Sequence, residues 1–100
     1  MSIRHIVIWK LNATEEADKA AAVSEVRSAL EPLVDHIPEL GSLTVSPNVA
    51  HFGVNGDVIL VAEFATLEDL AVYAAHPLHV EAGASIKPLF ASRTVIDFEF

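Results

Sequence analysis

The sequence contains no cysteine among its 100 residues, and it is poor in basic residues. Without cysteine there is no disulfide framework, no zinc–thiolate site and no thiol nucleophile. Six Lys and Arg residues stand against 14 Asp and Glu residues, which gives a formal net charge of −8. Because a polyanion repels such a chain at long range, nucleic acid and anionic membrane surfaces are poor partners.

Long apolar runs are also missing. The longest ones, such as residues 58–62, are far shorter than the roughly 20 residues that a membrane-spanning helix needs. The segment from Met1 to His5 fits a strand, and it lacks the uninterrupted apolar core of a signal peptide. We therefore expect a cytoplasmic protein that has no membrane partner.

Hydrophobic residues, by contrast, are abundant. They make up 52% of the chain, above the roughly 45–50% of an ordinary soluble domain. A chain of 100 residues forms one domain, here residues 1–100, and a domain of this size has a small interior. Association between chains would use the surplus of apolar side chains.

Hydrophobic periodicity predicts four strands and a helical segment on each side of the middle pair. We expect strands at about residues 3–11, 43–48, 57–65 and 93–100. Helices are expected at about residues 14–35, with Thr14 as N-cap, and at about 66–75, followed by another from Pro77. The order βαββαβ is the ferredoxin-like plan of the α+β class, with an antiparallel sheet.

Both faces of the predicted sheet carry large apolar groups. The first strand divides into Ile3, His5, Val7, Trp9 and Leu11 on one face and Arg4, Ile6, Ile8 and Lys10 on the other. Two helices can cover only one face of a four-stranded sheet. We expect a second copy of the chain to cover the other face by two-fold symmetry, which predicts a homodimer.

The segment Tyr73-Ala-Ala-His76-Pro77-Leu-His79 is the most informative stretch. Pro77 breaks the helix and pushes His76 to an extended conformation, so that His76 becomes an N-cap and His79 falls in the next first turn. The positive end of the helix dipole disfavours imidazolium there, and a neutral His79 can act as a base. Tyr73 can supply a phenol. The alternative is structural: a capping His76 and a half-buried Tyr73.

His5 is a second candidate because it lies on the same strand face as Trp9. A lone histidine on an apolar face is more often a core residue than a catalyst, yet it would border any cavity that this face encloses. The histidine spacings do not form a metal motif, and we assign no metal ligand and no cofactor.

These segments, together with Ile3–Val7 at the start and Arg93–Phe98 at the end, resemble the stress-responsive dimeric α/β-barrel (Dabb) domain family. The resemblance covers nearly the whole chain. It implies a ferredoxin-like subunit whose sheet meets that of its two-fold mate to form a barrel. Plant members of the family include heat-stable stress proteins and olivetolic acid cyclase, which closes a linear polyketide thioester by an intramolecular aldol condensation.

The resemblance also implies roles for particular residues. His79 and Tyr73 match the acid–base pair of the cyclase, and His5 matches a histidine of its first strand. His76 matches the other histidine of the motif, and we assign to it and to Trp9 a substrate-binding or structural role.

Three hypotheses about function follow. In the first, the protein is a cofactor-free cyclase, lyase or isomerase that acts on a carbonyl compound in the barrel cavity, with His79 as base, Tyr73 as its partner and His5 polarising the substrate. In the second, it is a non-catalytic stress-response protein or a barrel that binds a small apolar ligand. In the third, which rests on related dimeric barrels, His79 is a lone axial ligand of a heme or metal.

Overall fold

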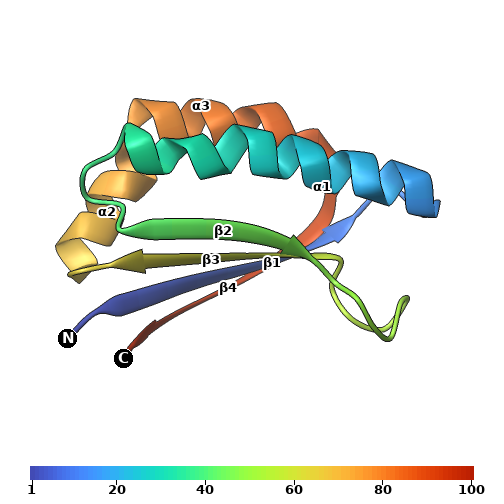
Figure 1. Cartoon of the computed structure of the whole chain (residues 1–100), viewed down its shortest axis with the longest axis horizontal. Helices are drawn as coiled ribbons and strands as arrows, with labels where there is room; N and C mark the ends of the chain where they lie inside the picture. Colours follow the sequence, from blue (N-terminus) through green and yellow to red (C-terminus); the bar gives the residue numbers. More distant parts are fainter.

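The computed structural model describes residues 1–100 and has the expected ferredoxin-like fold (Figure 1). The sheet is antiparallel, with strand order β2-β3-β1-β4. The elements in chain order are β1 (Ile3–Leu11), α1 (Glu16–Leu30), the 3-10 helix η1 (Glu31–Asp35), β2 (Ser42–Pro47), β3 (Val58–Phe64), α2 (Leu67–Ala75), α3 (Pro77–Ile86), the 3-10 helix η2 (Lys87–Leu89) and β4 (Phe90–Glu99).

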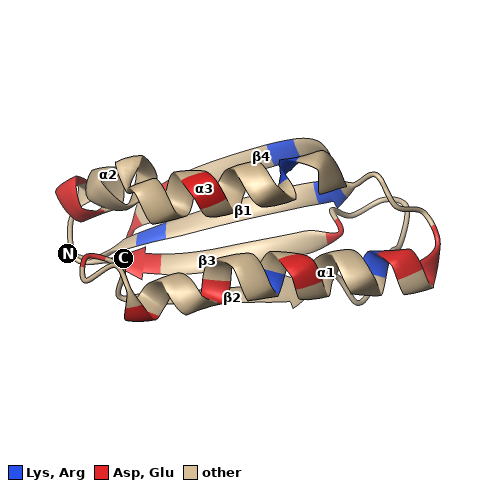
Figure 2. Ribbon diagram, turned by 90° about the horizontal axis from the view of Figure 1, so that it is seen from above, with Lys and Arg blue, Asp and Glu red and all other residues tan.

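The helices all lie on one face of the sheet. Helices α1 and α3 run side by side across it, and α2 lies at one end, near the chain termini (Figures 1 and 2). The covered face is the one that carries His5, Val7 and Trp9, and these side chains are buried under the helices. None of the helices combines the length and the apolar stretch that crossing a bilayer requires.

The predicted strands β2 and β3 are within one residue of the observed ones, and the larger differences from the sequence prediction are at three boundaries. Helix α1 begins at Glu16, and its N-cap is Glu15 instead of Thr14, because Glu15 holds the extended backbone of a cap (φ −77°, ψ 141°). The regular helix ends at Leu30, since Pro32 lies in the 3-10 turn η1 that completes the predicted helix. Strand β4 starts at Phe90, earlier than predicted.

The opposite face of the sheet has no helical cover. Its exposed side chains include large apolar ones: Ile8, Ile96, Phe98 and Phe100, which are 40%, 60%, 42% and 46% exposed. Cross-strand pairing places Ile6 beside Ile96 and Arg4 beside Phe98 on this face. The sheet therefore presents an apolar surface to its surroundings, as the alternation in β1 predicts.

Candidate active site

The break between α2 and α3 brings Tyr73 and His79 together. Helix α2 ends at Ala75 because His76 is extended (φ −64°, ψ 133°), as expected for a residue before proline. The ring of His76 accepts a hydrogen bond from the backbone N–H of Leu78 at 3.1 Å and so caps α3. The chain turns there, and the rings of Tyr73 and His79 lie 4.2 Å apart between centroids.

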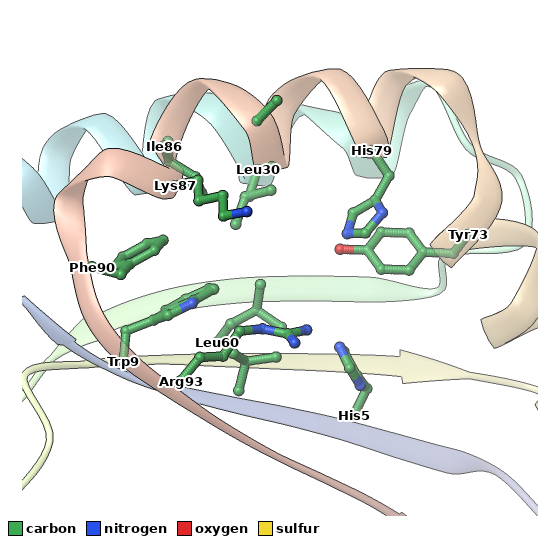
Figure 3. Close-up of a pocket in the computed structure, with 13 residues that line it drawn as sticks. His5, Trp9, Leu30, Leu60, Tyr73, His79, Ile86, Lys87, Phe90 and Arg93 are labelled. Atoms are coloured by element: carbon green, nitrogen blue, oxygen red, sulfur yellow. The ribbon is translucent and has the colours of Figure 1, made fainter.

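A pocket of about 300 Å³ lies between the sheet and α3, inside a single chain (Figure 3). His5, Trp9, Tyr73 and His79 all border it, whereas His76 does not. The sequence interpretation put the chemistry in a barrel cavity; the pocket is instead within one subunit because the His5 face of β1 is the one that the helices cover. Its lining consists of His5, Val7, Trp9, Leu30, Leu60, Tyr73, His79, Gly83, Ala84, Ile86, Lys87, Phe90 and Arg93.

His79 is held in the form of a base. Its Nδ1 lies 3.1 Å from the carbonyl oxygen of Ala74, and since a carbonyl only accepts, Nδ1 carries the proton. That leaves Nε2 with a free lone pair. Burial is the main cause that lowers the pKa of His79 from its ordinary 6.5. The hydrogen bond to Ala74 opposes this effect, and the charges of His5, Arg93 and His76 add to it. The imidazole is therefore neutral at pH 7.

Tyr73 is held in the form of a hydrogen-bond donor. The side chain is 1% exposed, with its ring packed between Phe64 and His79. Burial raises the pKa of Tyr73 to about 12, against a smaller opposing effect of Arg93. Its hydroxyl points into the pocket in Figure 3. A protonated phenol in this position can stabilise negative charge that develops on a bound oxygen.

His5 is oriented by a carboxylate on the neighbouring strand. The register of β1 and β4 pairs His5 with Asp97, so both side chains lie on the helix-covered face. The Nδ1 of His5 is hydrogen-bonded to Asp97 Oδ1, and its Nε2 remains for the pocket. The ring of His5 lies 6.3 Å from that of Tyr73 between centroids. A carboxylate in this position fixes the tautomer and the orientation of an imidazole.

The other end of the pocket is aromatic and apolar. Trp9 stacks on Phe90, with ring centroids 4.6 Å apart and planes 7° from parallel. Leu30, Leu60 and Ile86 complete this wall, away from the Tyr73–His79 end (Figure 3). The pocket thus joins a proton-transfer end to an apolar end.

Sequence reasoning missed four residues of this site: Asp97, Phe90, Lys87 and Arg93. The sequence shows that Arg93 and Asp97 share a phase of strand alternation, but only the register with β1 shows which face they occupy. Lys87 and Phe90 lie where the chain passes from α3 through η2 into β4, and neither helical nor strand periodicity identifies them. No group of three or more His, Cys, Asp or Glu side chains is arranged to hold a metal ion.

The sequence matches the family described as the stress responsive A/B barrel domain (Dabb) over residues 3–100. A comparison with curated proteins finds no match.

Solved structures with this fold include bacterial and plant proteins. A dimeric protein of unknown function from Bacteroides fragilis is 31% identical, with a TM-score of 0.86 and coverage of 99% of this chain and 96% of that one. A dimeric ferredoxin-like protein from Thermobifida fusca is also 31% identical, with a TM-score of 0.82 and coverage of 100% and 92%. A hydroxynitrile lyase from Passiflora edulis has a TM-score of 0.79 at 13% identity, with coverage of 97% and 91%, which shows the shared fold alone.

Proposed function

This chain belongs to the stress responsive A/B barrel (Dabb) domain family, and on that premise we propose that it is a small acid–base enzyme acting on a carbonyl compound. The observation that carries the proposal is the convergence of Tyr73, His79 and His5 on one pocket. The three side chains come from α2, α3 and β1, and each has the protonation state or hydrogen bond that its role needs. A cofactor is not required for this chemistry.

The first step is the removal of a proton from a carbon next to the substrate carbonyl. Nε2 of His79 takes the proton, the C–H bond breaks, and its electron pair moves into the carbonyl to form an enolate. The hydroxyl of Tyr73 donates a hydrogen bond to the enolate oxygen. His5, held by Asp97, lies on the sheet side of the same space and polarises or binds the substrate.

The fate of the enolate decides the class of reaction. Attack on a second carbonyl of the same molecule makes the enzyme a cyclase, return of the proton to another atom makes it an isomerase, and loss of a leaving group makes it a lyase. The Passiflora protein with the same fold is a hydroxynitrile lyase, which is consistent with lyase chemistry on this scaffold. The aromatic end at Trp9 and Phe90 would hold an apolar chain.

Proton removal is tested without knowledge of the final product. A medium-chain β-keto thioester and a lactone are incubated with the protein in D2O, and deuterium incorporation next to the carbonyl is followed by NMR above the uncatalysed rate. We expect the wild type to accelerate incorporation into at least one probe. In His79→Gln the acceleration should fall about 10²–10⁴-fold, the usual contribution of a positioned proton-transfer group.

The matched control is His36→Gln, because His36 is an exposed histidine that does not line the pocket. Thermal unfolding of each variant shows whether the fold is intact. Equal rates for folded His79→Gln and the wild type would contradict the proposed role of His79. Absence of acceleration in the wild type with both probes would count against the enzyme.

A second candidate, a barrel that binds a small apolar ligand without catalysis, is favoured by two observations. His76 and His79 both have backbone partners, and eight of the 13 lining residues are hydrophobic. This hypothesis predicts that the probes bind but exchange no proton, and that His79→Gln binds them as the wild type does. A role in the stress response stays a prediction for either candidate.

The uncovered sheet face supports a homodimer in both cases. Related proteins from Bacteroides fragilis and Thermobifida fusca are described as dimeric. Removal of Ile96, Phe98 and Phe100 from water would stabilise a pair of chains that meet through their sheets. Sedimentation velocity should therefore show a dimer.

A further inference from the structure

Two of the six basic side chains have no partner in the protein. Arg4, Lys19 and Arg27 each form an ion pair with a carboxylate, and Lys10 donates a hydrogen bond to the carbonyl oxygen of Asn55. The other two, Lys87 and Arg93, form no hydrogen bond and no ion pair. The chain has 14 acidic residues and a net charge of −8, yet none of these carboxylates pairs with Lys87 or Arg93.

Both free cations line the same pocket. Figure 3 shows Lys87 reaching into it from the helix side and Arg93 from the sheet side. None of the 13 lining residues is Asp or Glu, and the nearby Asp97 is bonded to His5. The side chains of Lys87 and Arg93 are also exposed to solvent, so they are accessible to a ligand, and an anion bound in the pocket would be attracted by both charges.

We propose that Lys87 and Arg93 form a subsite for an anionic oxygen group, so that the ligand of this pocket is an apolar carbonyl compound that carries a carboxylate or a phosphate. The planar guanidinium of Arg93 suits two-point binding of such a group, and the ammonium of Lys87 adds a point charge. Turnover of such a ligand rests on the proposed acid–base function. Binding of the anion to Lys87 and Arg93 does not depend on that function.

The position of Arg93 limits the shape of the ligand. Its charge is close enough to lower the pKa of both Tyr73 and His79, so the anion would lie near the proton-transfer end. Cross-strand pairing with Trp9 places Arg93 beside the aromatic wall as well. An acid with a short separation between carbonyl and anion, and an apolar chain directed at Trp9 and Phe90, satisfies both conditions.

The test measures binding and needs no turnover. Hexanoate, hexyl phosphate and hexanol share one apolar chain and differ in the head group, and each is titrated into the full chain by calorimetry and NMR. We expect an anion to bind about ten- to a hundredfold more tightly than hexanol, the usual gain from charge-assisted hydrogen bonds. Preference for hexanoate assigns a carboxylate, and preference for hexyl phosphate assigns a phosphate.

Two variants and one control decide the residues. Arg93→Gln and Lys87→Gln should each lose most of the preference for the anion, whereas Lys10→Gln removes the same charge outside the pocket and should keep it. Wild-type protein that binds all three probes equally, or none of them, would overturn the subsite. A Lys10→Gln variant that loses as much of the preference as Arg93→Gln does would overturn it as well.

An independent readout is the titration of His79. An anion on Arg93 cancels a charge that lowers the pKa of His79, so saturating hexanoate should raise that pKa in the wild type and leave it unchanged in Arg93→Gln. His79→Gln should retain the anion preference even though it cannot remove a proton. Failure of the enzyme hypothesis and failure of the anion subsite are therefore distinguishable.

Discussion

The two faces of the sheet are made by the same strands but differ in every property that matters for function. On the helix-covered face, Val7 is 2% exposed, and the ionisable His5 lies among buried apolar groups at the edge of a pocket. On the open face, Ile8 is 40% exposed, and the charged pair Arg4–Glu63 lies at the surface. Adjacent residues thus lie in different environments.

This difference shows where chemistry becomes possible. Burial shifts the pKa of Tyr73 and of His79 in opposite directions, because each loses solvation of its charged form, and both end up neutral at pH 7. Such a donor–acceptor pair requires a desolvated space, which only the helix-covered face supplies. The open face offers an apolar surface, which suits association with another chain.

The largest expected effect comes from a carboxylate placed on each face in turn. Val7→Asp should abolish folding at neutral pH, since an unpaired charge in the core costs several kcal/mol out of a typical total of about 5–15 kcal/mol. Ile8→Asp should fold, because the open face is hydrated in the isolated chain, but it should sediment as a monomer. Circular dichroism and sedimentation velocity check both results.

Val7→Ala and Ile8→Ala serve as size controls for these two variants. A folded dimer in Ile8→Asp would show that the open face does not mediate association. A folded Val7→Asp would show that the helix-covered face tolerates a charge, so the two faces would not differ in their tolerance of a carboxylate.

The next effect separates the hydroxyl of Tyr73 from its ring. Tyr73→Phe keeps the contacts with Phe64 and His79 and removes only the donor, so stability should change by less than about 1 kcal/mol. Deuterium incorporation should fall about 10²-fold, as for the loss of one oxyanion donor. Urea unfolding and the NMR exchange assay measure the two quantities. A large loss of stability with an unchanged rate would make Tyr73 a packing residue.

Much of the fold follows from the sequence for local reasons. Alternation in β1 shows which residues share a face, and Pro77 marks the helix break whatever the rest of the chain does. Thr66 has a side chain suited to a helix start, and its hydroxyl caps α2 by accepting a hydrogen bond from the backbone N–H of Asp69. These features depend on neighbours within a few residues, and physical rules for short segments apply to them.

The site follows from the sequence only in part. Tyr73 and His79 are close in the chain, and the helix break between them suggests that they converge. Arg93 and Asp97 join the site through the register of β4 with β1, which pairs residues about 90 positions apart for His5 and Asp97. No local pattern fixes that register, so their roles emerge only from the structure.

A smaller effect is the pH dependence that follows from His79. Its pKa is lowered by burial. The rate of proton removal should therefore rise with pH through a midpoint below 6.5 and reach a plateau above that midpoint. The same shift affects stability: the unfolded chain binds a proton that the folded chain does not, so the contribution of His79 is complete above pH 6.5. It is lost as the pH falls through the folded pKa. Rate profiles and unfolding at several pH values check both, with His79→Gln as control.

The smallest expected effect concerns Arg4 on the open face. Its Nη2 lies 3.0 Å from Glu63 Oε2, and its guanidinium carbon lies 3.8 Å from the ring centroid of Phe100. Both partners of the ion pair are about one third exposed, so solvent screens it. Arg4→Met in the monomeric Ile8→Asp background should therefore change the unfolding free energy by less than about 1 kcal/mol in urea.

The same substitution in the dimer tests whether association buries the side chain of Arg4. The Nε of Arg4 is buried without a partner in one chain, and a second copy seated on the open face would bury more of this side chain. Loss of one member of a buried pair costs about 3–5 kcal/mol, against less than about 1 kcal/mol at a surface. A larger effect in the dimer than in the monomer would show that association turns the open face into a second interior, whereas equal effects would leave Arg4 at its rim.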